Sequence, residues 1–382
     1  MNVYSQLKSL GSNLSSKVST LVPSPFGFKS NGTSHEPALD LASFSSLFDS
    51  YYLQTFDHLI ERAKEITNYK ENQKLVKHAR ALSYGGKRVR PYLCYLSYVS
   101  SGGDSFEDIR DVCVALELIH LFALVHDDIM DESTMRRGVT TTHHAYSGMT
   151  DTNAGSRSSE SMAILLGDLI YTWALEISSD HFAKHPNENA RKAVFTLLRE
   201  VIHGQMIDIV ISDAESVTTK ELREKNHLKT SSYTFIRPMN IGCLLADSTK
   251  NCEAFLQAGK HLGEAFQVID DVIDIAGNSK TTNKDMCLDI EAGQHTLISN
   301  YIKDNAKAEL SETFFAYFGS TLSEEDKMLV QNIALDSGAI DHSKKHASDE
   351  IDKGLLILSK QIDPSVLSTW QNLGDLLKRR MS

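Results

Sequence analysis

The sequence is poor in the residues that interrupt helices and in the patterns that form sheets. Only 7 prolines occur in 382 residues, and long alternating runs of β-branched side chains are missing, which argues against a fold rich in β-sheet. Apolar residues recur instead at i, i+3, i+4 and i+7, the spacing of amphipathic helices. This spacing occurs in Leu53–Ala79, Phe106–Asp128, Ser159–Ser178, Arg191–Ser212 and Gln257–Ile275. The sequence therefore predicts an all-α fold, one bundle of roughly ten or more helices.

Cysteine is also scarce, and its few copies are scattered. None of the five stands in a C-x-x-C pair; they are Cys94, Cys113, Cys243, Cys252 and Cys287. An odd, dispersed set predicts reduced thiols in a cytoplasmic protein and excludes a zinc site or a disulfide framework.

Positive charge and long apolar runs are lacking as well. The net charge is −11, which excludes nucleic acid as a partner because phosphate backbones require a basic surface. It does not exclude small anionic substrates, since clustered cations or a bound metal can reverse the sign locally. No stretch reaches the roughly 18 apolar residues of a membrane span, so the sequence predicts a soluble protein.

The first residues differ from the rest of the chain. Residues 1–35 contain nine serines, three lysines and no acidic residue. Val3, Leu7, Leu10, Leu14, Val18 and Leu21 are spaced as on a short amphipathic helix. The segment could be a transit peptide or a membrane-surface helix. Its lack of arginine and the interruption of the pattern by Gly11 argue against both. We predict a weakly ordered extension over 1–36, with membrane contact left open, and one all-α domain over 37–382.

Two copies of D-D-x-x-D stand at the ends of apolar helical stretches. They consist of Asp127, Asp128 and Asp131, and of Asp270, Asp271 and Asp274. Residues i and i+4 share one face of a helix, so the carboxylates of each copy project together. Oxygen-only ligands of this kind suit Mg²⁺, which bridges to substrate phosphates. A solvated acidic helix end is the alternative for one copy, but two copies in matching places favour metal and diphosphate binding.

Basic residues complement these carboxylates. Gly85–Pro91, which reads GGKRVRP, places three cations on a Gly-rich turn where the backbone can approach an anion. Arg136 and Arg137 follow Asp131 closely, and the planar fork of arginine suits phosphate. Each cluster alone would more often be a solvated face; beside the acidic motifs they indicate parts of one site.

The motifs together resemble the trans-isoprenyl diphosphate synthases. The resemblance rests on GGKRVRP, LELIHLFALVHDDIMDESTMRRG, ILLGDL, GQMID, KTSSYTF and GEAFQVIDDVID, which occur in this order from about residue 80 to 298. It implies an isoprenoid-synthase bundle around a central apolar cavity, and a head-to-tail condensation of isopentenyl diphosphate with an allylic diphosphate. About three Mg²⁺ ions would grip the allylic diphosphate while its C–O bond ionises. The released pyrophosphate would take the proton, so no protein base is implied.

The resemblance also assigns roles to single residues. It implies metal ligands at Asp127, Asp131, Asp270 and Asp274, with Asp128 and Asp271 as nearby or water-mediated partners. The isopentenyl diphosphate site would consist of Lys87, Arg90, His120 and Arg137. The allylic diphosphate site would consist of Arg136, Lys229, Thr230, Gln267 and Lys284. Gln205 and Asp208 match a GQxxD element whose Asp would support Lys229. A structural role is the alternative for His120, as for most single helical histidines.

Two positions depart from the family pattern, and a third, Phe122, bears on the chain length of the product. Gln294 replaces a usual lysine, which leaves one phosphate contact in doubt, and Thr140 replaces a usual proline. Phe122 lies five residues before Asp127, where a large aromatic would act as a floor under the growing chain. With the small Ala123 beside it, Phe122 favours a C20 (geranylgeranyl) or C15 (farnesyl) product. The alternative is that Phe122 is ordinary core.

Other functions remain open on the sequence alone. A terpene cyclase would carry one aspartate-rich motif, but the second D-D-x-x-D and GGKRVRP disfavour it. A non-catalytic subunit of a heteromeric synthase would typically lack some of the aspartates, all six of which are present. The resemblance further implies a homodimer. The basic residues Lys378–Arg380 could close over a diphosphate, but we expect them to be a solvated tail.

Overall fold

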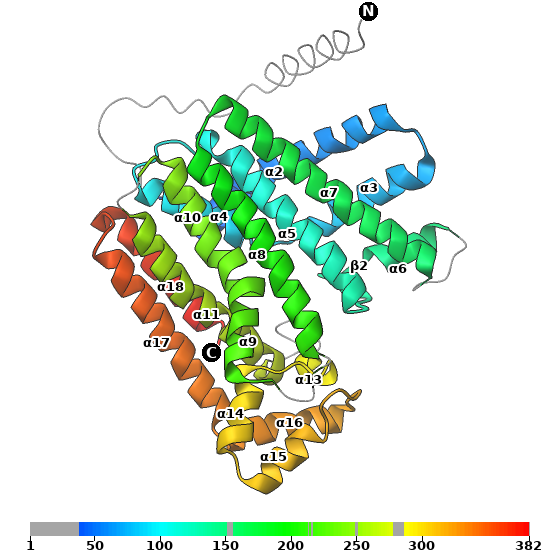
Figure 1. Ribbon diagram of the computed structural model, residues 1–382, viewed down its shortest axis with the longest axis vertical. Coiled ribbons are helices and arrows are strands. Elements are labelled where there is room, and N and C mark those ends of the chain that lie inside the picture. The colour runs from blue at the N-terminus through cyan, green and yellow to red at the C-terminus, as the bar shows by residue number, and fades with distance from the viewer. Residues whose placement is uncertain are drawn as a thin grey trace, which may run out of the picture. The chain divides into compact units, whose positions relative to one another are not determined.

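The computed structural model describes residues 38–150, 156–212, 214, 217–248, 251–277 and 286–381. Within these residues almost every element is a helix, as predicted (Figure 1). The helices are α2 (Leu41–Ile66), α3 (Lys70–Leu82), α4 (Val89–Ser100), η1 (Phe106–Asp108), α5 (Arg110–Met130), α6 (Thr142–Met149), α7 (Arg157–Lys184), α8 (Glu188–Ser212), α9 (Thr219–Asn226), η2 (His227–Ile236), α10 (Arg237–Leu245), α11 (Cys252–Ala276), α13 (Leu288–Glu291), α14 (Leu297–Asn305), α15 (Ala308–Phe315), α16 (Glu324–Asp336), α17 (Ala339–Ser359) and α18 (Pro364–Arg379). The extension 1–36 lies outside the described residues.

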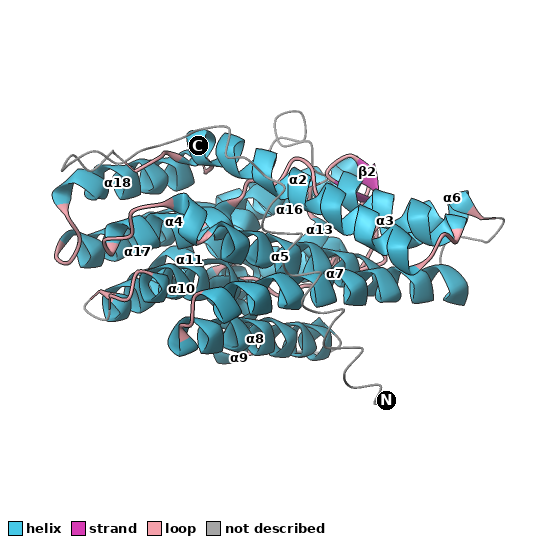
Figure 2. Cartoon of the chain, turned by 90° about the horizontal axis from the view of Figure 1, so that it is seen from above, coloured by secondary structure: helices cyan, strands magenta, loops and turns pink. Residues whose placement is uncertain are grey.

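The two helices that carry the aspartate motifs are largely apolar and form the centre of the bundle. Helix α5 packs mainly against α7, and α11 packs mainly against α17 and η2. Figure 2 shows these helices as stacked layers, with α17 and α18 on the side opposite α3 and α6. Because both helices are buried along most of their length, their charged ends are fixed by core packing.

Helix starts are set by local side-chain caps. Capping boxes begin α9 at Thr218, α14 at Thr296 and α16 at Ser323, and each cap of this type stabilises a helix by about 1 kcal/mol. Pro364 begins α18, where its missing N–H costs nothing.

Some sequence predictions need correction. The apolar pattern over Leu53–Ala79 spans two helices, α2 and α3, which are separated by residues 67–69 in a chain reversal. The segment Gly138–Arg157 is rich in Gly, Ser, Thr and Asn, a composition typical of a loop, yet it contains helix α6 and strand β2 (Val139–Thr140). Strand β2 pairs with β1 (Met135–Arg136) in a short antiparallel hairpin. Polar composition therefore hid a short helix that is held by contacts with α7 and α3.

The prediction of five reduced cysteines was wrong for one pair. Cys243 at the end of α10 and Cys252 at the start of α11 form a disulfide, with Cα atoms 5.6 Å apart. The other three are buried free thiols: Cys94, Cys113 and Cys287. A nine-residue separation gave no signal in the sequence, because the pairing depends on how α10 turns into α11.

Helix α7 is long and apolar enough to cross a membrane by composition alone, and 39% of its most apolar stretch is buried within the protein. A core helix has the same composition, and α7 packs along α5.

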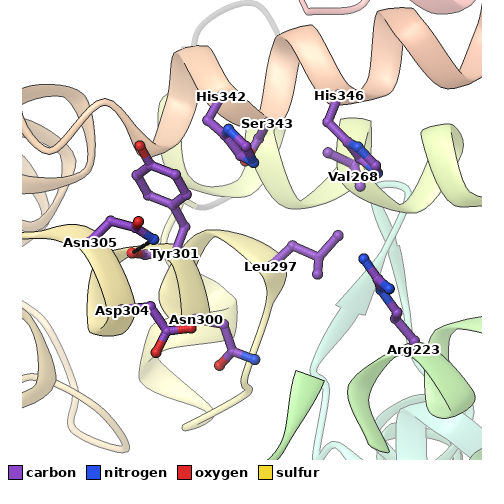
Figure 3. Close-up of a pocket in the computed structure, with 10 residues that line it drawn as sticks. All are labelled: Arg223, Val268, Leu297, Asn300, Tyr301, Asp304, Asn305, His342, Ser343 and His346. Carbon is purple, nitrogen blue, oxygen red and sulfur yellow. Dashed lines mark hydrogen bonds between the residues drawn. The ribbon is translucent and has the colours of Figure 1, made fainter. Parts of the chain in front are cut away.

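Two histidine–glutamate pairs join α11 to α17. His261 on α11 contacts Glu350 on α17 (Nδ1–Oε2 2.6 Å), and His346 on α17 contacts Glu264 on α11 (Nε2–Oε1 2.8 Å). Beside the second pair lies a cavity of about 180 Å³, into which His346 and Arg223 project (Figure 3). The pairs therefore tie the helix of the second aspartate motif to its neighbour.

The His346–Glu264 pair predicts a pH-dependent part of the stability. The hydrogen bond between the two side chains raises the pKa of His346 above the ordinary 6.5. A raised pKa in the folded state stabilises fully below about pH 6.5, and the stabilisation is lost as pH rises through the folded value. We expect His346→Gln to lower the unfolding midpoint by about 1–2 °C at pH 5.5, because both groups are partly exposed, and hardly at pH 8.5.

Glu264→Gln provides the control for this measurement, since it removes the same pair from the other side. Scanning calorimetry of both variants and the double variant at each pH would reveal the coupling. Equal losses at pH 5.5 and 8.5 would show that the pair does not stabilise the fold through its charge.

Candidate active site

The first motif occupies the last turn of α5 and the residue that ends it. Asp128 is buried and accepts a hydrogen bond from Arg136 Nε at 2.5 Å. Asp127 lies 3.6 Å from the same guanidinium, and Asp131 is exposed where the helix stops. Burial raises the pKa of Asp128 to about 6, although Arg136 acts against the shift. The cation is thus needed to keep a carboxylate ionised in this position.

The hairpin β1–β2 brings Arg136 back to the first motif and Arg137 to His120. Arg137 and Gly138 adopt positive φ angles of 53° and 77°, which closes the turn between the two strands. Thr141 secures the base of the hairpin by donating to the carbonyl of Ser133 at 2.6 Å. Arg136 therefore faces the aspartates, while Arg137 lies 3.4 Å from Nε2 of His120.

The second motif ends α11, and each of its carboxylates has a different partner. Asp270 accepts from Arg380 Nη2 at 2.6 Å. Asp271 is buried and accepts from Gln267 Nε2 at 2.7 Å, and burial together with Asp289 raises the pKa of Asp271 to about 8. Asp274 accepts from the backbone N–H groups of Leu288 and Asp289 at 3.1 and 3.2 Å, so it also holds the start of α13.

The C-terminal segment is not the solvated tail that we expected. The guanidinium of Arg380 pairs with Asp270 and lies over the ring of Phe266, 5.0 Å from its centroid. Its side chain is only 19% exposed. This contact joins residues 110 positions apart, which explains why the sequence gave no indication of it.

The three cations of Gly85–Pro91 have different environments. Arg88 is buried and pairs with Asp49 and Glu117, both at 2.6 Å, so it anchors the turn. Arg90 donates to Thr234 Oγ1 at 2.7 Å, and its guanidinium lies 4.0 Å from the ring centroid of Tyr233. Lys87 is exposed. Arg90 and Lys87 are therefore the two that can reach a ligand.

His120 contacts Arg137 directly and is linked to Arg90 through Tyr233. Its Nδ1 lies 2.7 Å from the hydroxyl of Tyr233, and its Nε2 faces Arg137. Burial, with Arg90 and Arg137 nearby, lowers the pKa of His120 well below its ordinary value. A neutral imidazole can share hydrogen bonds with a phosphate without adding charge. The four residues expected at the isopentenyl diphosphate site thus include three that contact one another directly or through Tyr233.

Lys229 lies between the first motif and the GQxxD element. Its Nζ is 3.3 Å from Asp127 and is bonded to Asp208 on α8. Burial alone lowers the pKa of Lys229, but Asp127 and Asp208 outweigh it and the net shift is upward. Lys229 belongs to the π-helix η2, a geometry that is frequent at functional sites. Thr230 follows it, partly buried, and Gln205 contacts Met130 through Nε2 at 3.4 Å. Lys284 lies outside the described residues.

Phe122 lies at the seam between α5 and α7. Its ring centroid is 5.1 Å from those of His126 and Tyr171, and the side chain is 9% exposed. Ala123 is partly buried beside it. Gly167 of ILLGDL allows this arrangement, because a Cβ there would lie 2.2 Å from His126.

The donor set fits magnesium that is bound partly through water. Among the described residues, no three His, Cys, Asp or Glu side chains converge as ready-made ligands. Three cations, Arg136, Lys229 and Arg380, pair with the motifs instead. Buried carboxylate oxygens on Asp128 and Asp271 accept no hydrogen bond. Oxygen-only donors with unused lone pairs are those that Mg²⁺ accepts, usually with several waters retained.

Comparison with known proteins identifies the family of the chain. The polyprenyl synthetase family model matches residues 72–333, a span that contains both aspartate motifs and every described candidate cation except Arg380. The chain belongs to the polyprenyl synthetase family. It is 34% identical over 76% of its length to a geranylgeranyl pyrophosphate synthase of Geoglobus acetivorans, covering 86% of that protein.

Other members of the family are similar to this chain in sequence and in structure. A short chain isoprenyl diphosphate synthase of Methanocaldococcus jannaschii is 33% identical over 66% of this chain and 72% of its own. The crystal structure of geranylgeranyl pyrophosphate synthase from Corynebacterium glutamicum, complexed with isoprenyl diphosphate and magnesium, superposes with a TM-score of 0.81 at 25% identity. That comparison covers 87% of this chain and 98% of the other, so most of this chain shares the all-α fold of that synthase.

Gly204 is a residue whose importance only the structure explains. A Cβ at this position would lie 2.4 Å from the backbone nitrogen of Lys229, so the glycine of GQMID lets η2 approach α8. We expect Gly204→Ala to displace Lys229 and to cost about 1–3 kcal/mol in the free energy of unfolding, the usual effect of overpacking. Chemical denaturation measures the loss.

Gly148→Ala is the matched control, because Gly148 also lies in a helix and has open space around it. There the alanine should be neutral or slightly stabilising, as its higher helix propensity implies. Similar stabilities for the two variants would contradict the close approach of η2 and α8.

Proposed function

We propose that this protein is a magnesium-dependent prenyltransferase that condenses isopentenyl diphosphate head-to-tail with an allylic diphosphate. The main product would be geranylgeranyl diphosphate, with farnesyl diphosphate as the shorter alternative. One observation carries the proposal: Lys229 contacts Asp127 and Asp208 together, in a chain whose two D-D-x-x-D motifs both lie at helix ends with cationic partners. The relatives that are named geranylgeranyl synthases support the C20 product.

The cations would divide between two diphosphates. Arg136 and Lys229 lie against the first motif, so they would bind the allylic diphosphate with Gln267 and Thr230. Lys87, Arg90 and Arg137 would bind isopentenyl diphosphate. Bound magnesium, about three ions in this proposal, would supply the positive charge that stabilises the leaving diphosphate. Lys284 of the allylic set would act from the segment outside the described residues.

The residues of this chain would control the geometry of the two substrates. Neutral His120, fixed by Tyr233, would accept or donate a hydrogen bond at the isopentenyl phosphate without repelling Arg137. Pairing with Arg136 would hold Asp128 ionised despite its burial. The apolar faces of α5 and α7 would exclude water from the reacting carbons, because water would quench an allylic cation.

Phe122 would end the elongation. Its ring, packed on Tyr171 and His126, lies one to two turns before Asp127 along α5. At 1.5 Å per residue, Phe122 lies about 7.5 Å from Asp127 along the helix axis. An allylic tail would extend from a diphosphate at the motif in this direction.

The remaining proposals concern assembly and location. Helices α7 and α8 expose apolar side chains that a second copy would cover, in line with a homodimer. They are Ile164, Leu165, Phe195, Ile202, Met206, Ile209 and Val210. A cytoplasmic location and membrane contact through residues 1–35 both stay predictions. The cytoplasmic location was predicted partly from reduced cysteines, and the Cys243–Cys252 disulfide weakens that reason.

The proposed function predicts turnover that depends on a divalent metal. We expect purified protein with Mg²⁺ to convert isopentenyl diphosphate and each of the C5, C10 and C15 allylic diphosphates to a C20 product, identified by mass spectrometry. EDTA should abolish turnover, and Asp127→Asn should reduce it at least about 100-fold, because a ligand for the leaving-group metal is lost.

Glu188→Gln is the control for Asp127→Asn, since Glu188 is an exposed acid that pairs with Arg191 far from the motifs. Turnover that begins only after a second subunit is added would replace the proposal with a non-catalytic partner role. A cyclic hydrocarbon product would indicate a terpene cyclase.

Phe122→Ala should lengthen the product beyond C20. Removing the ring opens space between α5 and α7 in the direction of the tail, so a further isopentenyl unit can be added. Product distribution by mass spectrometry measures the shift.

Leu121→Ala is the matched control for Phe122→Ala. Leu121 is buried on the same helix one residue earlier and points about 100° away around the axis. It should cost stability, about 2–5 kcal/mol for a buried leucine, and leave the product length unchanged. A C20 product from both variants would return Phe122 to an ordinary core role.

A further inference from the structure

Lys225 is a buried lysine that belongs to none of the motifs described above. It lies in the last turn of α9 and is 7% exposed. Its Nζ is 3.2 Å from Oδ1 of Asp208. Lysine is almost never buried without a partner, because removing an ammonium from water is costly. Its burial therefore requires the surrounding carboxylates.

Asp208 is shared between two lysines. Oδ1 faces Lys225, and Oδ2 accepts from Lys229. Burial by itself would raise the pKa of Asp208, but Lys229 and Lys225 outweigh it and the pKa is lowered. The carboxylate is thus ionised, and its single negative charge is balanced by two ammonium groups. One positive charge is left over.

The surplus charge is directed at the first aspartate motif. Lys229 Nζ lies 3.3 Å from Asp127 as well as in contact with Asp208. If Lys225 were neutral, Asp208 would be balanced by Lys229 alone. Lys229 would then form a closed pair with Asp208, and its charge would no longer be available to an anion at the motif.

We propose that Lys225 is a positioning residue that neutralises Asp208 and so leaves the charge of Lys229 free to bind the diphosphate of the allylic substrate. The geometry behind it is one carboxylate shared by two lysines, one of which also reaches Asp127. The substrate class rests on the proposed function; the effect on a bound diphosphate does not.

Binding of inorganic pyrophosphate in metal-free buffer tests the proposal without turnover. Isothermal titration should show affinity reduced about tenfold in Lys225→Met, which keeps the length of the side chain and loses its charge. Lys225→Arg should restore affinity to within about threefold, since it keeps the charge. Lys220→Met, on the exposed face of the same helix, should bind like the unaltered protein.

A second variant separates the sharing of Asp208 from a direct effect of Lys225. In Lys225→Met/Asp208→Asn the carboxylate of Asp208 can no longer capture Lys229, and only the contact with Asp127 that the unaltered protein also has remains. Pyrophosphate affinity should therefore return to within about threefold of the unaltered protein. This double variant also avoids an unpaired buried charge, which protects folding if Lys225→Met is unstable. Affinity as low as in Lys225→Met would overturn the proposal, as would unchanged affinity in Lys225→Met itself.

Steady-state kinetics with Mg²⁺ gives the corresponding result on the enzyme. Lys225→Met should raise KM for the allylic diphosphate about tenfold and leave KM for isopentenyl diphosphate unchanged, because Arg90, His120 and Arg137 contact neither Lys225 nor Asp208. Equal increases in both constants, in proportion to a fall in the unfolding midpoint, would indicate a structural role only and refute the proposal. If the unaltered protein shows no turnover, the proposed reaction fails while the pyrophosphate titrations still decide the role of Lys225.

Discussion

The structure depends on the balance between partly buried carboxylates and the cations that face them. The two D-D-x-x-D motifs end helices that are otherwise apolar, so their charges are drawn into surroundings that disfavour them. Arg136, Lys229 and Arg380 each pair with one of these motifs. Without such partners the carboxylates would protonate or repel one another. The carboxylate oxygens that accept no hydrogen bond from these cations are the kind of ligand that a divalent metal takes.

The scaffold holds those cations at fixed positions by close backbone packing. Gly204 lets η2 approach α8, so that Lys229 reaches both Asp127 and Asp208. The hairpin β1–β2 reverses the chain after α5 and returns Arg136 to the motif that precedes it. Because these contacts join backbone segments rather than flexible side-chain ends, the charges arrive preorganised, as electrostatic catalysis requires.

Sequence reasoning succeeded for the fold because helical periodicity is a local property. The apolar spacing located α5 and α11, and the motifs indicated which of their ends carry chemistry. It failed where composition and long-range packing diverge: residues 138–157 are polar yet include α6, and 53–79 is one pattern but two helices. Arg88 shows the same limit within a motif, since it anchors the turn through Asp49 and Glu117 rather than facing a ligand.

The sequence by itself determined the all-α class, the six aspartates and the family to which they point. Only the tertiary structure decided which charges meet. Arg380 reaches Asp270, and Cys243 bonds to Cys252; neither contact has a sequence signature. Lys225 became visible only through its burial against Asp208. The reason is physical: periodicity and motif spacing act within a few turns of helix, whereas a buried ion pair depends on how separate helices pack.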